Sequence, residues 1–412
     1  MDVSQVREKS SLFSIFLTFG VDQLGATIVF PIFAPLFLSP AQKLFDASVA
    51  LSYKTTMLGI FLGVFPLMQF IFSPLLGEYA DHHGRRKTLL LTTFLTFCGY
   101  GLCGVGIHYH SLFLIFFSRL MMGIGAGNLS ICLSALSDLS LSPRKKVRYF
   151  SYGSAIAGVM FVLGPFIGGK LSDPQVSSWF DSSFPMFLGG VLGLANFLFL
   201  LVAFKETLKV RSTAPFDFVK SIRNIQLALK TRSIKNFYLI YFCYLFSWNI
   251  IFLFIPAFAV QNFSLTNSRI GDLCALLGLC WVFGTGVVHR LVDRFFHPKW
   301  GMVGAFLLFA AVVIFVPFPS QLWAFIALLA VCTVISGLIW PVCTGAISNA
   351  APRNIQGKVM GLSQSMLSLT MMFASVLGGV FLQAHSIVPF LFSAISTVAA
   401  AVLVLIASFN PR

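Results

Sequence analysis

Long apolar segments recur along the whole chain, and they constrain the fold more than any other feature of the sequence. A helix needs about 20 apolar residues to cross the hydrocarbon core of a bilayer, and an open sheet would leave backbone groups unpaired in lipid. These segments do not alternate apolar and polar residues as the strands of a membrane barrel do. The sequence therefore predicts an all-α membrane protein with twelve transmembrane helices, near residues 11–37, 56–76, 88–107, 111–136, 149–169, 184–204, 236–260, 270–289, 301–317, 321–345, 358–381 and 387–408.

The charged residues support a lipid environment and argue against nucleic acid as a partner. Only 10% of the residues are charged and 57% are hydrophobic, whereas about a quarter of the residues of a soluble protein are charged. The net charge of +15 does not indicate a basic face, because the Lys and Arg residues lie in short connectors between apolar segments. The eight cysteines all fall inside apolar segments without a C-x-x-C pair, so we expect no disulfide framework and no metal site.

A polar stretch at 205–235 divides the segments into two sets of six. We interpret it as a cytoplasmic linker between two six-helix bundles, 1–204 and 236–412. On the side that would hold both termini lie 23 of the 28 Lys and Arg residues, and only four lie on the other side. The positive-inside rule therefore predicts that both termini and the linker are cytoplasmic, and we expect the chain in the cell membrane. The amphipathic middle of the linker comprises Phe218, Ile222, Ile225 and Leu229.

Two similar stretches suggest that the bundles arose by duplication. GPFIGG at 164–169 and ASVLGG at 374–379 occupy matching places in the fifth and eleventh segments. Runs of small residues are also common wherever membrane helices pack. Together with the six-plus-six count, the match favours parallel repeats that face each other across a central cavity.

Two opposite charges are predicted deep in the membrane. Asp22 follows about ten apolar residues, roughly 15 Å of helix, from the cytoplasmic start of the first segment. Arg119 lies about eight residues, or roughly 12 Å, from the opposite end of the fourth segment. In a hydrocarbon core about 30 Å thick the two reach similar depths, so we expect that they can meet. We interpret them as a proton or coupling site, because intramembrane charges are usually functional, although a structural ion pair would have the same sequence.

Glycines accompany these charges at helical spacing. RLMMGIGAG places Gly123 and Gly127 on the helical face of Arg119, where another backbone can approach closely. In GPFIGG, a proline and three glycines predict a bend and tight packing, which we interpret as a pivot or seal between the bundles. Ordinary helix packing explains these small residues equally well. The pivot residues are Gly164, Pro165, Gly168 and Gly169.

The stretch GEYADHHGRR at 77–86 is the most polar short segment between apolar spans. We interpret it as a short cytoplasmic turn, in which Gly77 allows close contact, Asp81 accepts hydrogen bonds from an exposed helix N-terminus and Gly84 permits the turn. Basic side chains of the stretch are expected to reach carboxylates on neighbouring helices. Such a cluster would act as a latch that holds while the cytoplasmic side is closed. The predicted gate motif is Gly77, Asp81, Gly84, Arg85, Arg86 and Asp138.

These motifs together resemble the major facilitator superfamily. GEYADHHGRR resembles its G-x-x-x-D-x-x-G-R-R motif, RLMMGIGAG its R-x-x-x-G-x-x-x-G motif, and GPFIGG the core of its antiporter signature. DQLGATIVFP, with Asp22, Gly25 and Pro31, is similar to the first helix of the tetracycline and multidrug proton antiporters. The sequence departs from these patterns at His82, at Met160 and in GVVHRLVDR at 286–294. The resemblance implies two six-helix bundles that rock about a midplane site, with Asp22 and Arg119 as the coupling region.

Several amides and large rings inside the spans are candidates to line a central cavity. Amphipathic rings beside single amides suit an amphiphilic organic solute, although each residue has a competing role in helix packing. The candidates are Gln69, Asn128, Trp248, Asn249, Trp340 and Gln364.

The sequence predicts a secondary carrier, a monomer that exports a small amphiphilic solute or drug in exchange for protons. No nucleotide-binding loop or catalytic triad is present in the sequence, so we expect no enzyme and no cofactor, with an ion gradient as the driving force. An uptake carrier for a nutrient or metabolite, as a symporter or uniporter, is the alternative within transport. A receptor or scaffold without transport activity is the alternative of another class.

Overall fold

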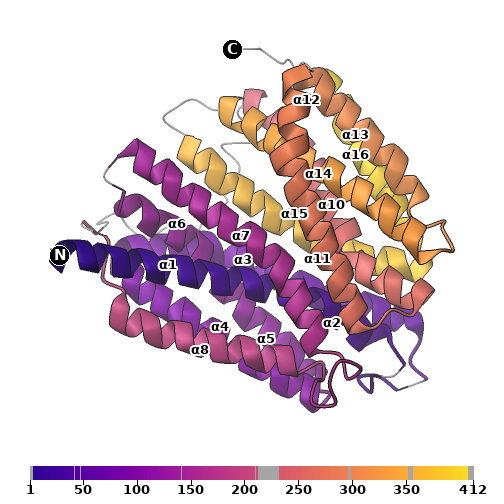
Figure 1. Ribbon diagram of the computed structural model, residues 1–412, viewed down its shortest axis with the longest axis horizontal. Helices are drawn as coiled ribbons and strands as arrows, with labels where there is room; N and C mark the ends of the chain where they lie inside the picture. The colour runs from indigo at the N-terminus through magenta and orange to yellow at the C-terminus, as the bar shows by residue number, and fades with distance from the viewer. Residues whose placement is uncertain are drawn as a thin grey trace.

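The computed structural model describes residues 3–40, 42–46, 48–140, 142–208, 210–211, 232–295, 298–350 and 356–406. Every regular element in these ranges is a helix, and the helices form two lobes (Figure 1). The indigo-to-magenta first lobe lies at the lower left of the view and the orange-to-yellow second lobe at the upper right. The predicted amphipathic middle of the linker, from Phe218 to Leu229, lies outside the described residues.

The first lobe contains the elements up to the linker. They are α1 (Val3–Ile28), α2 (Phe30–Leu38), α3 (Leu51–His83), α4 (Arg85–His108), α5 (Leu112–Gly125), α6 (Asn128–Asp138), α7 (Pro143–Leu171) and α8 (Phe184–Ala203). The second lobe contains α10 (Arg232–Phe263), α11 (Asn267–Phe283), the π-helical segment η1 (Gly284–Val288), α12 (His289–Phe295), α13 (Pro298–Phe315), α14 (Leu322–Ala350), α15 (Gln356–Ala384) and α16 (Val388–Ile406).

The apolar helices agree with the predicted spans. Eleven stretches in the described ranges are long and apolar enough to cross a membrane, and the shorter apolar helix at 299–315 lies where the ninth span was predicted. Apolar length is a local property of the sequence, so it predicts the number of spans well. The ends differ more, because α3 continues through polar residues as far as His83.

Two predicted continuous spans are broken in the first lobe. The first divides at Val29 between α1 and α2, because Pro31 has no backbone N–H and its ring is incompatible with the carbonyl four residues earlier. The fourth divides at Ala126 and Gly127 between α5 and α6, where two glycines within three residues weaken the helix. Both breaks lie deep in the lobe, close to the predicted coupling residues.

Two helix pairs make the most extensive contacts between the lobes, α3 with α15 and α7 with α11, and α2 also packs against α10 and α11. In each pair the backbones touch through glycines. A Cβ atom added to Gly59 would lie 2.9 Å from the Cα atom of Gly379, and one added to Gly169 would lie 2.7 Å from the Cα atom of Gly271. Gly169 and Gly379 end the two stretches that the sequence aligned as repeats. Each of these glycines therefore makes the same kind of contact with the other lobe.

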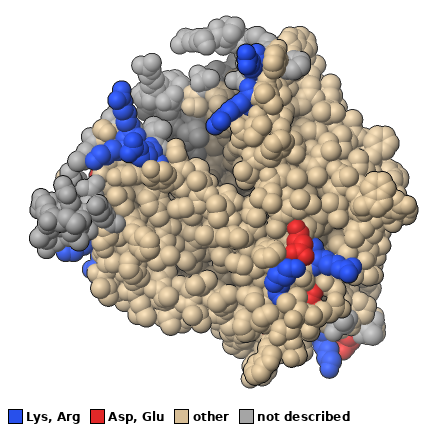
Figure 2. All heavy atoms as spheres, in the orientation of Figure 1, with Lys and Arg blue, Asp and Glu red and all other residues tan. Residues whose placement is uncertain are grey.

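The two ends of the molecule differ in charge and in how the lobes meet. We call the end where α1 begins, α16 ends and α3 meets α4 the basic end, and the end where α7 finishes and α11 begins the sealed end. The glycine contacts lie toward the sealed end. Figure 2 shows Lys and Arg side chains at the basic end, where the surface is hollowed between the lobes, and a broad uncharged belt across the middle of the molecule.

Candidate functional site

Asp22 lies on α1 inside the first lobe and borders a small cavity of about 40 Å³. Gln69 of α3 and Tyr100 of α4 line the same cavity. The Oδ2 atom of Asp22 is buried and makes no hydrogen bond within the described residues. A carboxylate oxygen in this position is costly while it is charged and unpartnered, so the site favours an exchangeable proton or a ligand group.

Asn128 has an amide side chain close to this carboxylate. It is the first residue of α6, directly after the break in the fourth span, and its side chain acts on the carboxylate of Asp22. Its Oδ1 atom accepts a hydrogen bond from the Thr92 hydroxyl of α4. The break therefore places a held amide beside the buried acid. Asn128 was predicted to line a central cavity, and it is not among the residues that line this small cavity.

Arg119 is buried, with only 2% of its surface exposed. Its guanidinium carbon lies 5.2 Å from the ring centre of Phe33 and 4.8 Å from that of Phe65. Such contacts with aromatic faces partly replace the lost hydration of the cation. The Nε and Nη1 atoms make no hydrogen bond within the described residues.

The expected meeting of Asp22 and Arg119 does not occur in this conformation. No ion pair joins them among the described residues. Tyr100, which is 1% exposed, lies within electrostatic reach of both charges. Its hydroxyl occupies the place that a Cβ atom on Gly25 would need. The Tyr100 ring therefore lies near both charges.

Gln69 connects this cavity to the second lobe. Its Oε1 atom accepts a hydrogen bond of 2.9 Å from the Ser368 hydroxyl of α15. Its Nε2 atom donates a weaker bond of 3.4 Å to the carbonyl of Ala126, which the break in the fourth span leaves free. Of the six predicted lining residues, Gln69 is the one that borders the cavity with Asp22.

The predicted tryptophans belong to an aromatic wall between the lobes. Trp248 stacks on Phe252 of α10 with ring centres 5.5 Å apart, and Phe252 stacks on Phe161 of the first lobe at 5.0 Å. Trp340 meets the edge of Trp281 at 5.9 Å. Because Trp248 is only 7% exposed, it packs in this conformation instead of lining an open cavity.

The remaining predicted lining residues are also not at the cavity. Asn249 is 6% exposed and its Nδ2 atom donates to the Thr370 hydroxyl at 3.3 Å. Gln364 is exposed on α15. Both lie within the second lobe, so their predicted role requires a different conformation.

The polar stretch at 77–86 is mostly helical, in contrast to the predicted turn. α3 runs through it to His83, and the single residue Gly84, with φ of +101°, links it to α4. Only glycine adopts this backbone conformation readily, so Gly84 permits the turn as expected. Gly77 lies inside the helix, and a Cβ atom there would have no neighbour within 4 Å. The close contact predicted for Gly77 is therefore wrong.

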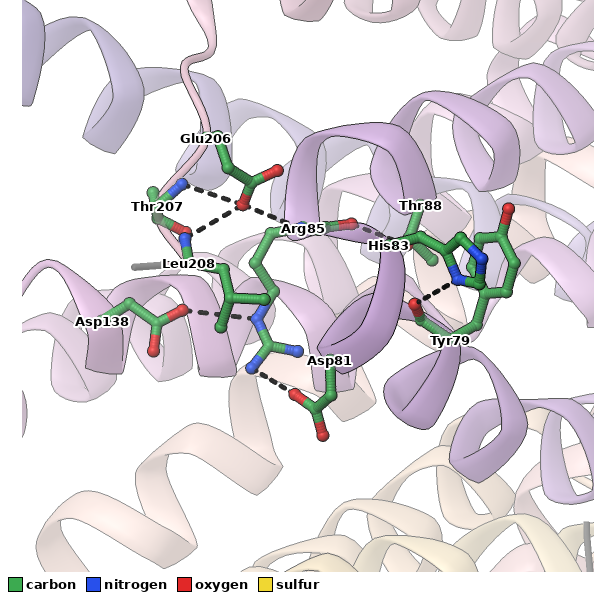
Figure 3. A network of polar contacts seen from close by, with 10 residues as sticks. Tyr79, Asp81, His83, Arg85, Thr88, Asp138, Glu206, Thr207 and Leu208 are labelled. Carbon is green, nitrogen blue, oxygen red and sulfur yellow. Dashed lines mark hydrogen bonds and ion pairs between the residues drawn. The ribbon is translucent and has the colours of Figure 1, made fainter. Parts of the chain in front are cut away.

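Arg85 is the centre of a charged cluster at the basic end (Figure 3). Its Nη2 atom lies 2.7 Å from Oδ1 of Asp81, and its Nε atom lies 3.3 Å from Oδ2 of Asp138. The predicted contact between Arg85 and Asp138 is present. Arg86 instead donates from Nη2 to the carbonyl of Leu201 at 2.7 Å, so it does not reach a carboxylate as expected.

Glu206 is a member of this cluster that sequence reasoning missed. It accepts a hydrogen bond of 2.9 Å from the backbone N–H of Arg85 at the start of α4 (Figure 3). It also accepts one of 3.2 Å from the backbone N–H of Arg86. A Cβ atom on Gly84 would overlap its carboxylate. Glu206, and not Asp81, therefore caps this helix N-terminus. The available signal was an acid directly after the sixth span, in KETL at 205–208.

The comparison with known families follows the same division into halves. The model of the Major Facilitator Superfamily matches residues 15–239 and 237–412. The chain belongs to this superfamily. It is therefore an integral, multi-pass membrane transporter of small solutes and not an enzyme.

Members that resemble the chain include resistance proteins. The class H tetracycline resistance protein of Pasteurella multocida is 24% identical, and the match covers 87% of this chain and 86% of that protein. Multidrug resistance protein 2 of Bacillus subtilis (strain 168) is 23% identical over 94% of this chain and 93% of that protein. The crystal structure of the human organic anion transporter MFSD10 has a TM-score of 0.69 at 20% identity and covers 96% of this chain and 99% of that chain.

The stretch GPFIGG contacts both its own lobe and the other lobe. Gly164 and Gly168 contact α1 of their own lobe, since Cβ atoms there would overlap Thr27 and the carbonyl of Ile28. Gly169 faces α11 of the other lobe, and the carbonyl of Pro165 approaches Gly271 of that helix. One face packs the lobe and the other lies in the seam between the lobes.

The glycines near Arg119 pack within the first lobe. A Cβ atom on Gly123 would lie 2.6 Å from the carbonyl of Phe65, and one on Gly127 would lie 2.6 Å from Leu76. Both contacts are with α3. The predicted shared face thus allows α3 to approach the broken fourth span closely.

Proposed function

We propose that the protein is a proton-coupled antiporter that exports a small amphiphilic organic solute by alternating access. The observation that carries this proposal is the buried, half-unpartnered carboxylate of Asp22 in a cavity whose wall includes Gln69, a residue bonded to the other lobe. The charge on Asp22 and the contact between the lobes are thus close enough to influence each other. The similarity to tetracycline and multidrug resistance proteins supports an organic solute and outward transport.

In this proposal the basic end faces the cytoplasm, as the distribution of Lys and Arg favours. Solute then enters between the lobes from the basic end while the glycine seams keep the sealed end closed. Loss of the Asp22 proton creates a charge that the low-dielectric cavity tolerates poorly, unless solute, water or rearranged side chains compensate it. Binding of solute and binding of the proton therefore compete for one state of the cavity.

In this scheme Arg119 and Tyr100 influence Asp22 through where their side chains lie. The Arg119 cation contacts aromatic rings instead of a carboxylate. Tyr100 has a hydroxyl group beside α1 and lies near both charges. We infer that Tyr100 sets how strongly Arg119 influences Asp22, and that a small movement of α4 changes this influence. An ion gradient alone drives the cycle, with no cofactor.

The proposal is tested first by a screen of amphiphilic metabolites and drugs for flux in sealed vesicles with an imposed pH gradient. We expect efflux-type exchange with protons for at least one amphiphile. Flux in the same direction as the proton would favour an uptake symporter. An absence of flux for every compound, with a folded protein in the vesicles, would favour the receptor or scaffold.

Proton release on solute binding tests the role of Asp22 directly. In weakly buffered detergent solution, the wild-type protein is expected to release protons when solute binds, and Asp22→Asn is expected to bind solute without release. Asp46→Asn removes an exposed acid between α2 and α3 and serves as the matched control. Equal proton release by Asp22→Asn and wild type would refute the assignment.

A further inference from the structure

The sealed end carries a polar junction between the lobes that the proposed coupling site does not use. Lys170, at the end of α7, donates from Nζ to Oδ2 of Asp272 at 2.7 Å and to the hydroxyl of Ser268 at 2.9 Å. Asn267 donates from Nδ2 to the carbonyl and hydroxyl oxygens of Ser172, at 3.2 and 3.1 Å. Each of these bonds joins α7 or the residues that follow it to the start of α11.

Asp173 makes the most specific of these contacts. Its Oδ2 atom accepts a 3.0 Å hydrogen bond from the backbone N–H of Ser268, in the first turn of α11. The side chain of Thr266 also bonds to this carboxylate. Thr266 occupies the N-cap position of α11 but makes no cap bond of its own. A carboxylate of the first lobe therefore caps a helix of the second lobe.

The surroundings of Asp173 favour its charged form. The side chain is 3% exposed, and burial by itself would raise its pKa. Hydrogen bonds from Thr266 and from the backbone N–H groups of Gln175 and Ser268, together with the nearby Lys170, outweigh burial and lower the pKa below its ordinary value. The positive end of the α11 dipole acts in the same direction. The cap is therefore a charged one at neutral pH.

The second seam has no comparable contact. Between α3 and α15 the polar link near the sealed end is one exposed bond of 3.3 Å, from the Thr56 hydroxyl to Oε1 of Gln383. Both seams have a glycine contact between backbones. Charge and helix capping are thus concentrated on the seam between α7 and α11 in the part of the chain that the structure describes.

We propose that Asp173 is a latch between the lobes, which supplies the N-cap of α11 only while the sealed end is closed. When the lobes separate at this end, α11 loses its acceptor and the carboxylate loses its partners. This side chain therefore contributes to the equilibrium between the two conformations. The inference rests on alternating access of the lobes and does not depend on which ion or solute is carried.

Spin-label distances across the sealed end test the latch without any solute or gradient. Labels at Val176→Cys and Asn262→Cys report one exposed position from each lobe, in a chain whose three partly exposed cysteines, Cys98, Cys243 and Cys280, are replaced by serine. Asp173→Ala is expected to raise the ratio of open to closed sealed ends about 5- to 30-fold, because a helix loses its cap. Asp173→Asn retains an acceptor oxygen and is expected to restore most of the closed population.

Asp181 offers a matched control on the same connector. Its Oδ1 atom accepts hydrogen bonds from the backbone N–H groups of Ser183 and Phe184, so it caps α8 of its own lobe. Asp181→Ala is expected to lower thermal stability without a change in the distance distribution. An unchanged distribution in Asp173→Ala, or an equal shift in Asp181→Ala, would overturn the proposal. Because the measurement needs no transport, its failure would leave the coupling role of Asp22 standing.

Discussion

Glu206 and Asp173 each cap a helix N-terminus, at opposite ends of the molecule, and they differ in what they join. Glu206, at the start of the linker, caps α4 of the first lobe at the basic end. Asp173 caps α11 at the sealed end, and the two belong to different lobes. The same chemistry thus fixes the shape of one lobe in the first case and the distance between lobes in the second.

This comparison changes the interpretation of the charged cluster around Arg85. The sequence suggested a latch that closes the cytoplasmic side. Its described ion-pair partners, Asp81 and Asp138, lie in the first lobe, and Glu206 at the start of the linker bonds to the same lobe. In this conformation the cluster braces a lobe at the hollowed end, and the glycine contacts between the lobes lie toward the other end.

The largest effect is expected from filling a seam where backbones touch. In Gly271→Leu the new side chain would start 2.7 Å from the carbonyl of Pro165. Overpacking typically costs about 1–3 kcal/mol, so the sealed end should open by up to about 100-fold, with loss of transport. Gly304→Leu on α13 is the control, because a Cβ atom there has no neighbour within 4 Å. Spin-label distances check the result, and a closed sealed end in Gly271→Leu would contradict it.

Removal of the cap within the first lobe should affect stability alone. Glu206→Ala deprives α4 of its acceptor and is expected to lower the free energy of unfolding by about 1 kcal/mol. Glu206→Gln retains an acceptor and should lose less. The measurement is thermal unfolding in detergent, with label distances across the sealed end as the second readout. A change in those distances would break the contrast between the two caps.

A smaller effect is expected where the lobes meet near Asp22. Ser368→Ala removes the hydroxyl that donates to Gln69, a bond worth roughly 0.5–1 kcal/mol, so the conformational equilibrium should shift about two- to fivefold. Ser154→Ala is matched to it, because that hydroxyl bonds only within α7. The rate of solute exchange in vesicles reports the shift. Equal exchange rates for both variants would show that the hydrogen bond between Gln69 and Ser368 does not affect the conformational equilibrium.

The smallest effect concerns pH at the sealed end. In the closed form, burial raises the pKa of Asp173, but its hydrogen bonds and Lys170 outweigh burial and lower the pKa below 3.8. The stabilisation of the closed form by Asp173 is therefore complete above pH 3.8 and is lost as pH falls through the lowered pKa. We expect constant label distances from pH 7 to 5 and a drift toward the open form below about pH 4. Lys170 and Asp272 face the same junction. Asp173→Asn must therefore remove the part of the drift that belongs to Asp173, and an identical drift would assign it to Asp272.

Local patterns predicted much of the fold. Apolar length predicted the number of spans, because it is a local property of each span. The matching positions of Gly169 and Gly379 predicted that the two halves are repeats. Gly84 was also predictable, because a glycine between a helix end and two arginines indicates a turn. The contact of Arg85 with Asp138 followed from the expected side of the membrane for each residue.

Contacts that depend on rotation about a helix axis were not predictable. Asp22 and Arg119 were expected to reach a similar depth, but depth does not fix the direction in which a side chain points, and no ion pair joins them among the described residues. Tyr100 lies near both because Gly25 leaves room for its hydroxyl, a fit that only the packed helices reveal. The cap from Asp173 to α11 joins residues of different lobes, and nothing in either local sequence specifies the other.

The central claim is that protonation of Asp22 couples the proton gradient to solute movement. The most direct test compares two kinds of flux in the same vesicles, uphill solute transport driven by a pH gradient and exchange of solute for solute without a gradient. The account predicts that Asp22→Asn loses the first and keeps the second, while Asp46→Asn keeps both. Uphill transport by Asp22→Asn at the wild-type rate would contradict it.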